Sequence, residues 1–158
     1  DAVLPGGADA VARGVVRMFA RHRIALQREV SLRNGRRADL MGLGEKGEIV
    51  IVEIKCSRAD LIGDRKWPEY LDYCDRFYWA FPPGLDARPV NDEAFLPERT
   101  GLIVADAYDA EIVRPAARHA LAASRRKVEM QRLAWLAMHR LSRHADPELA
   151  RLMASFGD

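Results

Sequence analysis

The stretch that decides the fold runs from residue 36 to residue 55 and reads Arg36-Arg37-Ala38-Asp39-Leu40-Met41-Gly42-Leu43-Gly44-Glu45-Lys46-Gly47-Glu48-Ile49-Val50-Ile51-Val52-Glu53-Ile54-Lys55. Two apolar runs flank a turn that has a glycine at each end, Gly44-Glu45-Lys46-Gly47. This pattern predicts a β-hairpin. The second run, residues 49–54, is β-branched at nearly every position, which favours a strand that is covered on both faces.

Charged residues stand at the end of this apolar strand. Glu53 and Lys55 are two residues apart, so an extended strand directs both side chains to one face. Because an unpaired buried charge is costly, these groups need partners. Asp39 lies in the first run of the hairpin, where it supplies a second carboxylate. The structural alternative is an ordinary surface ion pair between Glu53 and Lys55.

Two carboxylates at a sheet edge suit a hard divalent cation. Asp39 and Glu53 would offer oxygen ligands to Mg²⁺ or Mn²⁺, and the backbone carbonyl of Ile54 is the expected third ligand. Such an ion polarises a phosphodiester and acidifies its bound water. Lys55 would orient that water or neutralise charge in the transition state. We therefore regard Asp39, Glu53 and Lys55 as candidate catalytic residues.

Hydrophobic periodicity and turn residues predict the other elements of the chain. Helices are expected at residues 8–22, 57–62, 67–74 and 124–143, with a closing helix that starts at Asp146-Pro147-Glu148 and ends at Phe156. Strands are expected at residues 24–32, 37–43, 48–55, 76–81, 100–105 and 107–113, with a loop at 86–99. This order predicts an α/β fold whose mixed central sheet is flanked by helices, followed by a C-terminal helical segment.

The predicted helices carry apolar faces that we expect to be buried. These faces comprise Val11, Val15, Met18 and Phe19 in the first helix, Leu71 and Cys74 in helix 67–74, and Val128, Leu133, Trp135, Leu136, Met138 and Leu141 in helix 124–143. Lys66, Tyr70 and Tyr73 are expected on the opposite side of helix 67–74 from its core face.

The composition indicates an ordinary soluble protein. At 158 residues, with an apolar fraction of 49%, the chain is most simply one domain, residues 1–158, with a core at about 8–114 and a helical part at about 115–158. No apolar stretch approaches the roughly 20 residues of a membrane helix, so we expect no membrane partner. Cys56 and Cys74 form no CxxC pair, which favours a reducing, cytoplasmic location.

Charge is distributed unevenly along the chain. Residues 1–38 carry a net charge of +5, residues 39–111 carry −8, and residues 112–158 carry +5. An acidic middle between basic ends fits a cation-binding centre beside a surface that binds a polyanion such as DNA. Exposed helices with solvated arginines explain the same distribution, so charge alone leaves both interpretations open.

Four blocks of the sequence carry a resemblance to a known family. They are Arg36-Arg37-Ala38-Asp39, Val52-Glu53-Ile54-Lys55-Cys56-Ser57, Asp64-Arg65-Lys66-Trp67-Pro68-Glu69-Tyr70-Leu71-Asp72-Tyr73-Cys74-Asp75 and Arg76-Phe77-Tyr78-Trp79-Ala80. Asp39 followed by Glu53-Ile54-Lys55 resembles the motif of the PD-(D/E)XK nuclease superfamily. The longer blocks resemble the bacterial MmcB-like family, which is assigned to DNA repair. The likeness covers roughly residues 10 to 130.

The resemblance implies a restriction-endonuclease-like core, with Asp39 and Glu53 as metal ligands and Lys55 as the catalytic lysine. It places Lys66 and Tyr70 where superfamily members contact the scissile phosphate. Further DNA contacts are expected from basic side chains, namely Arg37, Arg125, Arg126 and Lys127. The chain departs from the superfamily pattern in the first helix, which has no glutamate between residues 11 and 23. The number of metal ions therefore stays open.

The leading hypothesis is a metal-dependent DNA phosphodiesterase that acts in bacterial DNA repair, a deoxyribonuclease that uses Mg²⁺ or Mn²⁺. The alternative is a non-catalytic DNA-binding repair accessory that retains the nuclease fold. A third reading is a protein-interaction module whose carboxylates are structural. DNA is the expected partner, and the sequence leaves homodimerisation and contacts with other repair proteins open.

Overall fold

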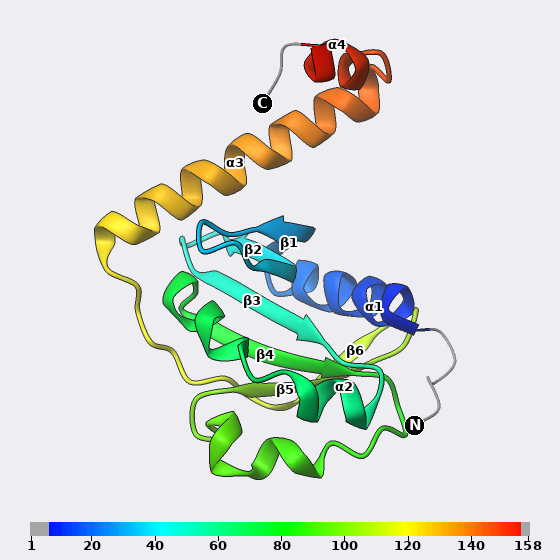
Figure 1. The fold of residues 1–158 in the computed structure, drawn as a ribbon, viewed down its shortest axis with the longest axis vertical. Coiled ribbons are helices and arrows are strands. Elements are labelled where there is room, and N and C mark those ends of the chain that lie inside the picture. Colours follow the sequence, from blue (N-terminus) through cyan, green and yellow to red (C-terminus); the bar gives the residue numbers. More distant parts are fainter. Residues whose placement is uncertain (1–6, 156–158) are drawn as a thin grey trace.

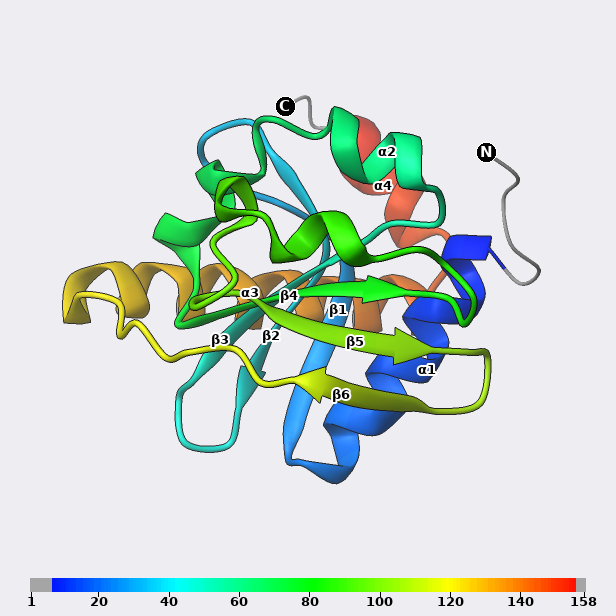
Figure 2. The same cartoon turned by 90° about the horizontal axis from the view of Figure 1, so that it is seen from below.

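The computed structural model describes residues 7–155 and consists of one six-stranded sheet with helices around it (Figure 1). The strands are β1 (Ile24–Ser31), β2 (Arg37–Gly44), β3 (Ile49–Ile54), β4 (Arg76–Phe81), β5 (Gly101–Ala105) and β6 (Ala110–Arg114). They lie in the order of the chain, with β3, β4 and β5 parallel and the other neighbours antiparallel. Figure 2 shows β4, β5 and β6 side by side. The predicted α/β class with a mixed central sheet is confirmed.

β3 is the central buried strand, as its β-branched sequence predicts. All six of its residues are buried. Helix α1 (Gly7–Arg21) covers one face, where Val11, Val15 and Phe19 pack against the even-numbered residues of β3. On the opposite face, Ile49 and Ile51 belong to an aromatic-rich core that includes Trp67 of η1 and the neighbouring β4 residue Phe77. Because both faces are covered, the charged side chains at the end of β3 must reach solvent or find a partner at the rim of the core.

The segment after the short helix α2 (Arg58–Gly63) corrects one expectation. Residues 67–73 form the 3₁₀ helix η1 (Trp67–Tyr73) rather than an α-helix. With three residues per turn, Trp67, Tyr70 and Tyr73 fall on one side, and all three are buried. The expected division, with tyrosines on the outer side of an α-helix, is therefore wrong. Two further 3₁₀ turns, η2 (Arg88–Asn91) and η3 (Glu93–Phe95), lie in the predicted loop.

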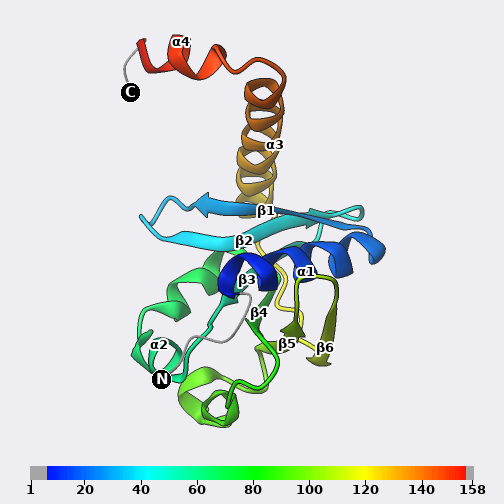
Figure 3. The same cartoon turned by 90° about the vertical axis from the view of Figure 1, so that its right-hand side faces the viewer.

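The C-terminal helices form an arm that is less buried than its sequence predicts. α3 (Ala123–Ala145) passes beside β1 and carries α4 (Leu149–Ser155) at its far end (Figure 3). Leu133 is buried, but Trp135, Met138 and Leu141 are 60%, 70% and 69% exposed. The expected buried stripe on α3 is wrong over this second half, where the Arg140 side chain contacts β1 and these three apolar side chains stay exposed. Phe156, the expected end of the closing helix, lies outside the described residues.

Within residues 7–155, no helix combines the length and apolarity that a membrane span requires.

Asp75 fastens the arm to the sheet at the beginning of β3. Its buried carboxylate accepts the backbone N–H of Ile49 at 2.7 Å and of Leu121 at 2.8 Å. The same carboxylate accepts hydrogen bonds from both terminal nitrogens of Arg126, at 2.6 and 2.5 Å. Burial alone would raise the pKa of Asp75, but the bonds from Arg126 and the two backbone N–H groups lower it to about 2.

Replacing Asp75 with asparagine should destabilise the fold. Asp75→Asn removes one charge of a largely buried pair and leaves Arg126 uncompensated, so we expect the free energy of unfolding to fall by about 3 kcal/mol. Urea denaturation at pH 7 measures this loss. The matched control is Asp72→Asn at an exposed position of η1, which should change stability by less than about 0.5 kcal/mol. Equal losses in the two variants would contradict the assigned role of Asp75.

Candidate functional site

Two carboxylates meet where β2 and β3 end their pairing. Leu40 and Val52 form the final registered pair. Beyond it, the backbone N–H of Asp39 donates to Glu53 Oε1 at 2.9 Å, and the backbone N–H of Ile54 donates to Asp39 Oδ2 at 2.8 Å. Each carboxylate therefore replaces a backbone acceptor of the neighbouring strand. This exchange brings Asp39 and Glu53 side by side and leaves one oxygen of each outside these two bonds.

β1 changes its side-chain orientation directly opposite Asp39. The pairs Arg28–Leu40 and Val30–Ala38 place Glu29 across from Asp39. Glu29 has a φ of 52°, a left-handed conformation that is uncommon for glutamate. Leu26 packs against the α1-side core whereas Val30 belongs to the core on the other face, so the alternation of β1 reverses here. Such backbone conformations concentrate at functional sites.

Lys55 lies two residues after Glu53. Its ammonium is held by Asp60 of α2 and by Asp64, the C-cap residue of that helix. Its Nζ lies 2.9 Å from Asp64 Oδ2 and 3.8 Å from Asp60 Oδ1, and its side chain is largely buried. Burial alone would lower the pKa of Lys55, but its bond to Asp64 and the nearby carboxylates raise it above its usual range. Lys55 is therefore an ammonium that can stabilise negative charge. It is unsuited to act as a general base.

These groups line an open, mostly polar pocket of about 600 Å³, which we call the carboxylate pocket. Its lining residues are Arg36, Arg37, Asp39, Glu53, Ile54, Lys55, Ala59, Asp60, Gly63, Asp64 and Tyr70. Four carboxylates face three cationic side chains in this set. Asp60 and Asp64 were not among the site residues predicted from the sequence, although Asp64 begins the longest block that carries the family resemblance.

Among the expected phosphate contacts, the structure brings Arg37 and Tyr70 to the carboxylate pocket and leaves Lys66 outside its lining. The Tyr70 hydroxyl donates to the backbone carbonyl of Arg37 at 3.0 Å. Burial raises the pKa of Tyr70, and the carboxylates of Glu53 and Asp39 raise it further, so the hydroxyl stays protonated. Arg37 is exposed at the rim. Tyr70 thus fixes the backbone that presents Arg37.

The basic residues of α3 lie at the other end of β3. Arg126 donates to Gly47 O at 2.7 Å as well as to Asp75, so its guanidinium serves the fold. Arg125 lies over the Tyr73 ring, 4.7 Å from its centroid, and Lys127 is exposed. Six residues of strand separate Gly47 from Glu53, which corresponds to roughly 20 Å. These three residues therefore do not belong to the carboxylate pocket.

The charge of the site suits a divalent cation. Burial raises the pKa of Glu53 to about 9, and the adjacent Asp39 contributes to the rise. No group of three or more His, Cys, Asp or Glu side chains within residues 7–155 is arranged as a metal site. Mg²⁺, however, is commonly bound through one or two carboxylates and keeps several waters. Asp39, Glu53 and the Ile54 carbonyl fit that mode of binding.

Most of the chain matches the sequence pattern of one family. The model of the family described as "DNA repair protein MmcB-like" matches residues 1–148. The chain belongs to the MmcB-like family. This membership indicates a role in DNA repair, and it confirms the resemblance of the longer sequence blocks to the MmcB-like family.

A solved structure is similar to this family member over nearly its whole length. It is the SPO1766 protein of unknown function from Silicibacter pomeroyi, with 46% sequence identity and a TM-score of 0.81. The similarity covers 92% of this chain and 94% of the SPO1766 chain. No curated protein matches the chain at a significant level.

Glu53 should make stability depend on pH in the absence of metal. The folded state holds a proton up to about pH 9, whereas unfolded Glu53 releases it near its ordinary value of 4.5. The melting temperature in a chelator should therefore fall as pH rises from about 5 to 9. Glu53→Gln has no such proton to lose and should melt roughly 3–6 °C above the parent at pH 9.

The control for this measurement is Glu111→Gln on the exposed strand β6, which should follow the parent profile. Parallel pH profiles for the parent and Glu53→Gln would show that Glu53 is ionised in the folded protein.

Proposed function

We propose that this MmcB-like protein is a divalent-metal-dependent DNA phosphodiesterase of the PD-(D/E)XK type that acts in bacterial DNA repair. One observation carries the proposal. The exchange of backbone bonds between Asp39 and Glu53 sets two carboxylates beside the ammonium of Lys55 in an open polar pocket. The family membership supplies the link to DNA repair.

Asp39, Glu53 and the carbonyl of Ile54 would hold Mg²⁺ or Mn²⁺. When bound, such an ion activates water and withdraws charge from a phosphodiester. Lys55 contributes a fixed positive charge for the phosphate oxygens, since Asp64 holds its ammonium in place. Arg37 binds an adjoining phosphate at the rim, because guanidinium groups match phosphate geometry. Tyr70 orients Arg37 through its backbone.

One contact favours the alternative of a non-catalytic DNA-binding accessory. The Lys55 ammonium already lies against the carboxylates of Asp64 and Asp60, which offset part of its charge toward a phosphate. A protein that keeps the carboxylates for metal-assisted DNA binding alone would tolerate this arrangement. The two functions differ in whether a bound strand is cut.

Loss of the site residues should abolish cleavage. With Mn²⁺ or Mg²⁺ and labelled single-stranded, nicked and branched DNA, we expect the parent to cut at least one substrate. Asp39→Asn and Lys55→Ala should each reduce the rate by at least about 100-fold, because each removes a charge needed in the transition state. Gel analysis of the products measures the rates.

Glu111→Gln is the matched carboxylate control and should cut as the parent does. Mn²⁺ should raise the melting temperature of the parent and not that of Asp39→Asn, which reports metal binding without cleavage. Metal binding without cleavage of any substrate would favour the accessory role. Full activity in Asp39→Asn and Lys55→Ala would contradict the proposed site.

The salt dependence of DNA binding should distinguish basic residues that contact phosphates from those that stabilise the fold. Arg37→Gln should reduce the slope of log K against log salt concentration by about one, since one phosphate contact is lost. Lys127→Gln should do the same if DNA reaches the first turns of α3. Arg126→Gln should instead lower stability, because Arg126 is bonded to Asp75. Filter binding in a chelator measures the slopes, and an unchanged slope in Arg37→Gln would remove Arg37 from the interface.

A further inference from the structure

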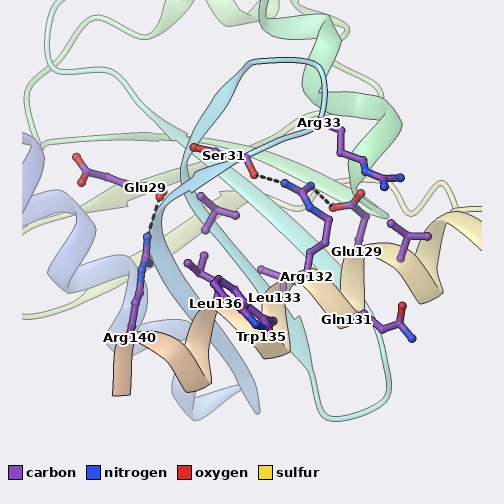
Figure 4. A pocket seen from close by; sticks show the side chains of 12 residues that line it. Glu29, Ser31, Arg33, Glu129, Gln131, Arg132, Leu133, Trp135, Leu136 and Arg140 are labelled. Atoms are coloured by element: carbon purple, nitrogen blue, oxygen red, sulfur yellow. Dashed lines mark hydrogen bonds and ion pairs between the residues drawn. The ribbon is translucent and has the colours of Figure 1, made fainter. Parts of the chain in front are cut away.

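A second pocket of about 660 Å³ lies between α3 and the edge strand β1 (Figure 4). Two arginines of α3 fix the helix to the strand. Arg140 donates to the backbone carbonyls of residues 28 and 29 at 2.5 and 2.9 Å, and Arg132 donates to Ser31 O at 2.8 Å. The walls of this pocket are therefore tied together by hydrogen bonds. We call it the α3–β1 pocket.

The α3–β1 pocket combines an aromatic surface with cationic groups. Trp135 is 60% exposed, lines the pocket and stacks on His139 with ring centroids 4.7 Å apart. Figure 4 shows Trp135 between Arg140 at one end and Arg132 and Arg33 at the other. An exposed indole flanked by guanidinium groups matches a base and its neighbouring phosphates, which stack and pair with such side chains.

One polar atom of this pocket lacks a donor. Glu129 is only 1% exposed, and its Oε2 lies 3.3 Å from Arg132 Nη1. Its Oε1 has no hydrogen-bond partner among the described residues, and Arg125 Nη1 lies 3.9 Å away. A buried acceptor without a donor is costly. Nucleobases carry amine and imide donors, so a bound base would supply the kind of group that this site lacks.

We propose that the α3–β1 pocket binds an unpaired nucleobase of single-stranded DNA, stacked on Trp135, with the adjoining phosphates on Arg33 and Arg132. A paired base has its Watson–Crick edge occupied and its faces stacked, so a duplex cannot insert a base here without opening. The pocket therefore selects single strands or unpaired segments.

The two pockets lie on either side of the β1–β2 edge. Ser31 of the α3–β1 pocket pairs with Arg37 of the carboxylate pocket, and Glu29 lies across from Asp39. Neighbouring strands are about 5 Å apart, so a few nucleotides span the distance between these facing residues. We expect a single strand held at Trp135 to cross this edge into the carboxylate pocket. This step rests on the proposed function and makes single-stranded DNA its substrate class.

Charge disfavours a second copy of the chain as the occupant. The exposed apolar residues Met138 and Leu141 continue beyond Trp135 and resemble a helix-pairing surface. Arg132, Arg140 and Arg143 lie on the same helix, however, so an α3–α3 pair would bring like charges together. A polyanion neutralises this helix.

Tryptophan fluorescence tests the proposal directly. Trp67 and Trp79 are buried, so quenching by a stacked base reports on Trp135. The full chain is titrated in a chelator with single-stranded oligothymidylate of about twelve nucleotides, within the usual site size of single-strand binders. We expect quenching with the single strand and little with a blunt duplex of equal length. Trp135→Leu should bind at least about tenfold more weakly, and Leu141→Ala should bind as the parent does.

Asp39→Asn separates this inference from the proposed function. It should bind and quench as the parent does while failing to cut. Parent cleavage with unchanged binding by Trp135→Leu would overturn the inference and leave the proposed function intact. Quenching without any cleavage by the parent would support the inference and contradict the proposed function. Equal quenching by the duplex would overturn the inference in favour of duplex binding. Tryptophan emission that changes with protein concentration alone would overturn it in favour of self-association.

A folding defect in Trp135→Leu is recognised by circular dichroism. Arg33→Gln then provides the second test, because Arg33 is exposed and its replacement should not disturb the fold. This variant should reduce the slope of log K against log salt concentration for single-strand binding by about one. An unchanged slope would overturn the assignment of Arg33 to the phosphate.

Discussion

The burial of β3 on both faces is the constraint on which the remaining structure depends. A strand with six buried residues needs α1 on one face and the aromatic layer with α3 on the other. Where β2 and β3 stop pairing, their last backbone N–H groups still require acceptors. Asp39 and Glu53 supply them. The carboxylate pair is thus part of the sheet's own hydrogen bonding, and the same bonds that finish the sheet bring together the groups proposed to act on DNA.

The two ends of β3 show how a partner decides the behaviour of a buried carboxylate. Asp75, beside the start of the strand, meets Arg126 and two backbone N–H groups, and its pKa falls to about 2. Glu53, near the end, is buried beside a second carboxylate, and burial together with the charge of Asp39 raises its pKa to about 9. The first group is a permanently charged fastening for the helical arm. The second holds a proton in the folded state, and the divalent cation that we propose for this site would have to displace it.

Local patterns in the sequence predicted most of the sheet and the core of the site. The β-branched run, the glycine turn and the spacing of Asp39 and Glu53 are short-range signals, and the structure agrees with the elements that they predict. The 3₁₀ form of η1 has no comparable signal, because three-residue and 3.6-residue periods are hard to separate over seven residues. The partners of Lys55 and Arg126 come from folding rather than spacing. Asp75 is 51 residues from Arg126, and no periodicity reports such a contact. The second half of α3 has an apolar pattern that predicts burial, but there Arg140 contacts β1 across 112 residues of sequence, and no periodicity reports that contact.

The arginines that cover β1 have a consequence for biosynthesis. β1 leaves the ribosome well before α3, since Arg132 and Arg140 are 101 and 112 residues away from the carbonyls of Ser31 and Arg28 that they cover. A nascent chain therefore passes through a stage in which this edge strand is formed but not yet protected, and an uncovered strand edge invites pairing with other chains. Slow translation, or premature termination before α3, would prolong that stage, so the helical arm also acts late in synthesis as a safeguard against misassembly.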